Sequence, residues 1–152
     1  NDAVKTVRWV TSQLDDREKR LTGQAKTDFQ SQAAPLRAEL SVVEDSVYQT
    51  KNRSGQDPLN YPIRLNNKIA ALAGVAGSAE AAPTRQTTAV YGALSKQLDV
   101  ELTAMKKTLD ARLPAVNATL RKAGLPEIVP RPADVPAPPG IISNNDNALH
   151  AQ

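Results

Sequence analysis

Apolar residues recur in steps of three and four along most of this chain, which is the spacing of helices with one buried face. A first stripe runs from Val4 to Ala25, and a second runs from Leu36 to Thr50. Asp2 precedes the first stripe and is the expected N-terminal cap of its helix. Pro35 stands between them, and proline inside a helix removes one backbone hydrogen bond and clashes with the preceding turn. We therefore expect helices near residues 2–32 and 35–52, with Pro35 starting the second or kinking one longer helix.

The second half of the chain predicts a short helix and then a long one, near residues 59–77 and 83–123. Two helix-start patterns, Asp57-Pro58 and Asn60-Tyr61-Pro62, precede the short stripe. Pro114 lies inside the long stripe and should bend it. The stripe of the short helix is Leu65, Ile69, Leu72 and Ala76, and that of the long helix is Thr87, Tyr91, Leu94, Leu98, Leu102, Met105, Leu109, Leu113, Val116 and Leu120.

The character of the chain changes after Leu125, because six prolines fall between Pro126 and Pro139. Such a segment cannot be helical and is typical of extended or polyproline-like structure. Its prolines already restrict the unfolded chain, so docking costs little backbone entropy, and side chains must anchor it. We expect the apolar anchors Ile128, Val129, Ile141 and Ile142 to lie in grooves between helices, either of their own bundle or of a neighbouring copy.

Length and composition support one helical domain. The chain has 152 residues, 40% of them hydrophobic, but it holds one Trp, one Phe and three Tyr. Small aliphatic side chains suit closely packed helices better than a sheet sandwich. We predict an all-α, up-and-down four-helix bundle over residues 1–124 and an extended Pro-rich tail over residues 125–152. The last helix, about 60 Å long at about 1.5 Å per residue, should pack along several others or project to meet another chain.

The excess positive charge of the chain lies in residues 51–68. The net charge of the whole chain is +3, and Lys51, Arg53, Arg64 and Lys68 against Asp57 account for it. Elsewhere basic and acidic residues are interleaved, which is typical of solvated helix faces, so we expect no nucleic-acid partner. No apolar run approaches the roughly 20 residues of a membrane-spanning helix, so we expect no membrane span.

The polar corner between the second and third helices has two interpretations. In the first, its side chains cap two helix ends and pair with nearby carboxylates or carbonyls; this is favoured, because helix-end groups must be satisfied in any case. In the second, it is a basic, amide-rich pocket for an anionic ligand, a sugar or a partner loop. The corner residues are Lys51, Asn52, Arg53, Gln56, Asp57, Asn60, Arg64, Asn67 and Lys68.

Catalytic and metal-binding patterns are weak. The pairs Asp15/Asp16, Glu44/Asp45 and Asp99/Glu101 lie on charged helix faces and are expected to be solvated. The chain has no cysteine and one histidine, His150, which makes a thiolate, a histidine-based triad or a multi-histidine metal site unexpected. No glycine-rich phosphate loop is present. We predict no catalytic residue, no metal and no cofactor.

Residues 48–72 carry a family resemblance. They begin Tyr-Gln-Thr-Lys-Asn-Arg-Ser-Gly-Gln-Asp-Pro-Leu-Asn-Tyr-Pro, and the later Ala82-Pro-Thr84 and Gly124-Leu-Pro126 fit the same pattern. Over about residues 2–126 the chain resembles the C-terminal helical region of large bacterial secreted proteins with sortilin-like or BNR-type β-propeller repeats, often labelled glycosyl hydrolases. The resemblance implies an upstream β-propeller of the same precursor as partner and an extracellular or periplasmic location. It carries over no catalytic residue.

Together these features predict a non-catalytic helical interaction or assembly module, which could form a homo-oligomer or filament through its tail. Two alternatives stay open: an accessory domain of a glycoside hydrolase, and a carbohydrate- or anion-binding module that uses residues 51–68. The chain begins at Asn1 without a Met or a signal peptide, so we expect a processed form or a fragment of a longer protein.

Overall fold

The computed structural model describes residues 2–49, 61–78 and 84–131. It contains the helices α1 (Asp2–Arg20), α2 (Gly23–Val47), α3 (Leu65–Ser78) and α4 (Arg85–Lys122). Helices make up 84% of the described residues, and no strand occurs among them. The all-α class and the long last helix are therefore confirmed.

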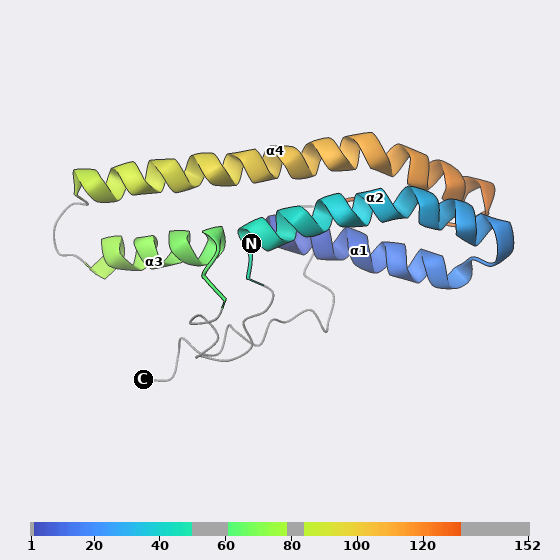
Figure 1. Cartoon of the computed structure of the whole chain (residues 1–152), viewed down its shortest axis with the longest axis horizontal. Coiled ribbons are helices and arrows are strands. Elements are labelled where there is room, and N and C mark those ends of the chain that lie inside the picture. The colour runs from blue at the N-terminus through green and yellow to red at the C-terminus, as the bar shows by residue number, and fades with distance from the viewer. Residues whose placement is uncertain (1, 50–60, 79–83, 132–152) are drawn as a thin grey trace.

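Helix α4 spans the whole length of the molecule, and different helices cover its two parts (Figure 1). Helices α1 and α2 lie under its C-terminal part, whereas α3 lies under its N-terminal part. The most extensive contact is between α2 and α4. We call α1, α2 and residues 105–122 of α4 the three-helix half, and α3 with residues 85–104 of α4 the α3–α4 hairpin.

The hydrophobic core lies in the three-helix half. Its largest fully buried side chain is Phe29, the only phenylalanine of the chain. None of the described side chains of α3, residues 65–74, belongs to this core cluster. The cluster consists of Val7, Val10, Leu14, Leu21, Phe29, Ala33, Leu36, Leu40, Leu109, Leu113, Val116, Leu120 and Ile128.

The boundary predicted between the first two helices is wrong. Helix α1 ends at Arg20, and α2 starts at Gly23 and continues through Pro35 to Val47. Gly23 has a φ of +58°, a left-handed conformation that glycine adopts at little cost, so the chain reverses there. Helix α2 continues through Pro35 because its apolar stripe is buried on both sides of the proline. A proline inside a helix destabilises it by about 3 kcal/mol, whereas burial of each Leu or Phe side chain stabilises the fold by about 1.5–3 kcal/mol.

The third helix starts later than predicted, at Leu65 instead of near residue 59. Pro62 precedes it in non-helical backbone, and its carbonyl accepts a hydrogen bond of 2.9 Å from the Gln49 amide. The second helix likewise ends at Val47 instead of near residue 52.

Helix α4 has a stripe with an 11-residue period. Thr87, Leu98, Leu109 and Leu120 are 11 positions apart, and Tyr91-Leu102-Leu113 and Leu94-Met105-Val116 repeat the interval. Eleven residues in three turns is close to the 3.6 residues per turn of the helix itself, so the stripe stays on one face along its length. Figure 1 shows the C-terminal third of α4, which contains Pro114, curving over the three-helix half.

A glycine ends α4 and turns the chain back along the bundle. Gly124 has a φ of +69° and donates to the Arg121 carbonyl at 3.1 Å, while Leu125 donates to the Leu120 carbonyl at 3.0 Å. These two bonds form a Schellman motif, which satisfies the last carbonyls of the helix. The extended segment that follows, residues 125–131, is called the strap.

Candidate interaction surfaces

The strap is held to α4 by one buried amide. The Asn117 side chain donates from Nδ2 to the Ile128 carbonyl at 3.0 Å, and its Oδ1 accepts the Ile128 N–H at 2.8 Å. Asn117 is buried and thus unavailable for glycosylation, although it begins an Asn-Ala-Thr triplet. The Ile128 side chain, only 1% exposed, lies in the hydrophobic core of its own bundle.

Helix α1 holds the next residue of the strap in the same way. The Gln13 side chain donates to the Val129 carbonyl at 2.8 Å and accepts the Val129 N–H at 3.2 Å. Arg17 donates to the Pro126 carbonyl at 2.9 Å. Successive residues of an extended chain turn their backbone groups to opposite sides, so α4 binds residue 128 and α1 binds residue 129.

Val129 does not fill a groove of its own bundle, because its side chain is 52% exposed; docking of this side chain on a neighbouring copy stays a prediction. Residues alternate in an extended chain, so burial of Ile128 turns its neighbour outward. The other two predicted anchors, Ile141 and Ile142, lie outside the described residues.

Most residues of the predicted polar corner also lie outside the described part of the chain, namely Lys51, Asn52, Arg53, Gln56, Asp57 and Asn60. Arg64, Asn67 and Lys68 are described and lie at the start of α3. Arg64 and Lys68 are exposed one turn apart, and no described carboxylate forms an ion pair with either of them.

The carboxylates of α1 and α2 mostly join helices to one another. Asp15 pairs with Arg37 of α2, and Arg8 of α1 binds Glu44 of α2 at 2.7 Å while its guanidinium lies 5.2 Å from the centre of the Tyr48 ring. Both ion pairs therefore link α1 to α2.

Glu39 joins α2 to α4. Arg112 donates twice to its Oε1, at 2.7 and 3.1 Å, and the Thr108 hydroxyl donates to its Oε2 at 3.0 Å. Hydrogen bonds from Arg112 and then from Thr108 favour the charged carboxylate, so they lower the pKa of Glu39 from its ordinary value.

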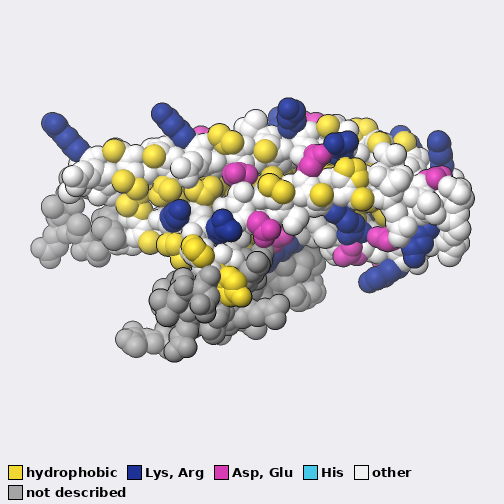
Figure 2. All heavy atoms as spheres, in the orientation of Figure 1, with side chains coloured by type: hydrophobic (Ala, Val, Ile, Leu, Met, Phe, Trp, Pro, Cys, Tyr) yellow, Lys and Arg dark blue, Asp and Glu magenta, His cyan; other side chains and the backbone are white. Residues whose placement is uncertain are grey.

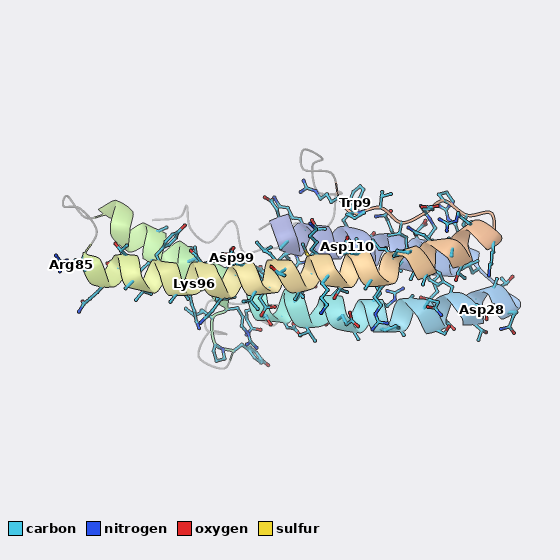
Figure 3. The ribbon with its side chains drawn as sticks, turned by 90° about the horizontal axis from the view of Figure 1, so that it is seen from above. Trp9, Asp28, Arg85, Lys96, Asp99 and Asp110 are labelled. Atoms are coloured by element: carbon cyan, nitrogen blue, oxygen red, sulfur yellow. The ribbon has the colours of Figure 1, made fainter. Side chains whose placement is uncertain are left out.

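The α3–α4 hairpin leaves part of the α4 stripe uncovered. All buried side chains of α4 come at or after Thr108, among its described side chains. Before that point Tyr91 is 54% and Leu102 is 36% exposed, although both lie on the same stripe as the buried Leu113. Figure 2 shows hydrophobic side chains gathered along the boundary between α3 and this part of α4. Figure 3, seen from above α4, shows that Arg85, Lys96 and Asp99 lie on the part that extends past α1 and α2.

Sequence reasoning missed Gln13, Arg17 and Asn117, the three side chains that bind the backbone of the strap. The available signal was weak: Asn117 is a polar residue next to the apolar stripe, and it precedes a Pro-rich segment whose backbone needs partners. Which carbonyls reach it depends on the turn at Gly124, and the stripe alone does not specify that turn.

The described residues contain no group of three or more His, Asp or Glu side chains placed to hold a metal ion. None of the described helices has an apolar stretch that could cross a membrane. An open groove of about 510 Å³ lies between α4 and the strap, with Pro114, Asn117 and Ile128 in its wall.

No protein-family model matches the chain, and neither does any curated protein or solved structure. The resemblance to propeller-associated helical regions therefore remains a hypothesis that rests on residues 48–72 and two shorter patterns.

Proposed function

We propose that this chain is a non-catalytic helical interaction module and that the α3–α4 hairpin is its partner-binding surface. The observation that carries the proposal is the continuous stripe of α4, which is buried in the three-helix half and partly exposed in the hairpin. One helix with one apolar face thus has two different surroundings. Exposed apolar side chains grouped on a surface are typical of sites that a partner covers.

The family resemblance suggests which domain that partner is. A propeller-associated helical region would meet the β-propeller of the same precursor, outside the cytoplasm. The exposed stripe is suited to such a neighbour, because a helix pair with no third helix beside it in the described part of the chain can complete its packing against another domain.

Site-specific photo-cross-linking tests this proposal. A photoreactive phenylalanine analogue replaces Tyr91 in one variant and Val100 in another, and both are produced in the organism that makes the protein. Val100 is 67% exposed and lies half a turn out of phase with Tyr91, so it is a matched control on the opposite face. We expect one defined cross-linked product from the Tyr91 variant and none from the Val100 variant. Equal cross-linking from both positions would contradict the proposal.

The rival function is binding of an anion or carbohydrate by the corner, either alone or as an accessory site of a glycosidase. The observation in its favour is the pair of exposed cations, Arg64 and Lys68, one turn apart and without a described acidic partner. Calorimetry with anionic and neutral sugars distinguishes the two functions. Binding that is lost in an Arg64→Ala/Lys68→Ala variant, together with glycosidase activity that requires this region of a longer parent protein, would favour the rival.

A further inference from the structure

We propose that Gln13, Arg17 and Asn117 form a binding site for an extended, proline-flanked peptide, and that the strap of a second copy of this chain can occupy it. In the structure the chain's own strap, Leu-Pro-Glu-Ile-Val-Pro-Arg, fills the site. This surface is separate from the α3–α4 hairpin, so either proposal can fail without the other.

The contacts are those expected for recognition of a peptide. Two side-chain amides each bind both backbone groups of one residue, as the neighbouring strand of a sheet would. Asn117 binds the backbone of Ile128, and Gln13 binds the backbone of Val129. Arg17 donates a hydrogen bond to the Pro126 carbonyl. Pro126 and Pro130 have no N–H that would need a partner. The backbone of residues 126–129 is thus bound largely by side chains of two helices.

Side-chain chemistry adds selectivity to this backbone recognition. Ile128 enters the core cluster between the helices, so the central position requires an aliphatic residue. One position earlier, Glu127 pairs with Arg121 at 2.6 Å. The site therefore fits the pattern proline, acidic residue, aliphatic residue, any residue, proline. Every copy of the chain carries a segment with this pattern.

Exchange between copies depends on the hinge at Gly124. The strap reaches its own bundle because Gly124 takes a positive φ and the Schellman bonds reverse the chain. The contacts to α1 join residues more than 100 positions apart, so they depend on the shape of the site and not on local chain connection. If the hinge straightens, the strap leaves its own bundle and meets the same site on a second copy, which gives a closed, two-fold symmetric dimer.

The experiment compares two glycines in the full chain. Gly124→Ala and Gly23→Ala place a Cβ at positive φ with no atom within 4 Å of it, so both introduce similar backbone strain. Only Gly124 is the strap hinge. Light scattering after size-exclusion chromatography should show a higher dimer fraction for Gly124→Ala than for the wild type and for Gly23→Ala. A second substitution, Asn117→Leu, should return the Gly124→Ala variant to monomer.

A peptide experiment tests the same site without relying on the hinge. The full chain with Ile128→Asp, which disables its own strap, is titrated with a labelled synthetic peptide of residues 123–131. Circular dichroism checks that the variant remains helical. We expect saturable binding, weakened about tenfold or more when Asn117→Leu is added, because two backbone hydrogen bonds are lost.

Several results would overturn the proposal. One is a folded Gly124→Ala variant with no more dimer than Gly23→Ala; another is a dimer that persists in the presence of Asn117→Leu. Absence of peptide binding to a folded Ile128→Asp chain would show that the site does not accept this segment in trans.

Discussion

Buried polar side chains tie distant segments of this molecule together. Thr108 and Asn117 of α4 and Gln49 after α2 are the buried polar residues of the described chain. Each bonds to a different element: Thr108 to Glu39 of α2, Asn117 to the strap, and Gln49 to the Pro62 carbonyl before α3. Leaving one such partner unsatisfied costs about 1–3 kcal/mol, so these residues select the observed arrangement over packings that satisfy only the apolar stripes.

Glu39 gives the first prediction, on the pH dependence of stability. Because hydrogen bonds from Arg112 and Thr108 lower its pKa in the folded state, Glu39 contributes stability above the pKa of the unfolded chain, near 4.5. That contribution is lost as the pH falls through the lowered folded pKa. Glu39→Gln should therefore reduce the melting temperature at pH 7, and the difference from wild type should shrink at acidic pH.

Thermal unfolding followed by circular dichroism from neutral to acidic pH measures this difference. Glu101→Gln is the control, because it removes a carboxylate of α4 to which no described cation is ion-paired. A Glu39→Gln deficit that stays constant down to the most acidic pH would show that the charge on Glu39 does not stabilise the fold.

At the scale of elements, proline inside a helix was a misleading boundary signal. Pro35 suggested a helix start, yet α2 continues through it. The true reversal lies at Gly23, where the apolar stripe thins but predicts no helix end. Periodicity reports which face is buried; it does not report where the chain turns back along its neighbour. The backbone conformation of one glycine decides that here, and periodicity is insensitive to it.

Pro35 and Pro114 allow a test at the scale of the helices. Each proline in a helix interior leaves the carbonyl four residues earlier without its usual partner. Pro35→Ala and Pro114→Ala should each stabilise the protein, by about 1–3 kcal/mol, if alanine completes the helix without disturbing the core. Urea unfolding measures the change. A loss of stability in Pro114→Ala would mean that the curvature of α4 is needed to bring it onto α1 and α2.

At the scale of the whole molecule, the sequence predicted the all-α class and the long last helix. It did not predict which helices cover which part of α4. The α4 stripe is chemically similar from Leu94 to Leu120, so nothing in it distinguishes the part that packs on α1 and α2 from the part that packs on α3. Ile128 was identified as an anchor by its apolar character. Its polar partner Asn117 was not, because amide-to-backbone recognition depends on tertiary geometry that a single sequence does not display.

This unequal covering of α4 leads to a prediction about its dynamics. In the three-helix half, Leu113 and its neighbours must leave a closed core before their amides exchange. In the hairpin, α3 is the one described helix that lies along the stripe. Amides of residues 88–100 should therefore exchange with solvent at least about a hundredfold faster than those of residues 110–120, since several buried aliphatic side chains separate the two opening free energies. Hydrogen exchange followed by mass spectrometry resolves the two parts.

A matched pair of substitutions makes this test specific. Leu98→Ala and Leu113→Ala remove the same atoms from one stripe of one helix, 15 positions apart. Leu113→Ala should speed exchange throughout α1, α2 and the C-terminal part of α4, because it opens the shared core, whereas Leu98→Ala should speed exchange only in the hairpin. If both variants changed protection along the whole chain equally, the molecule would unfold as one cooperative unit. The hairpin would then open no more easily than the core, and this result would argue against its exposed stripe as a partner-binding surface.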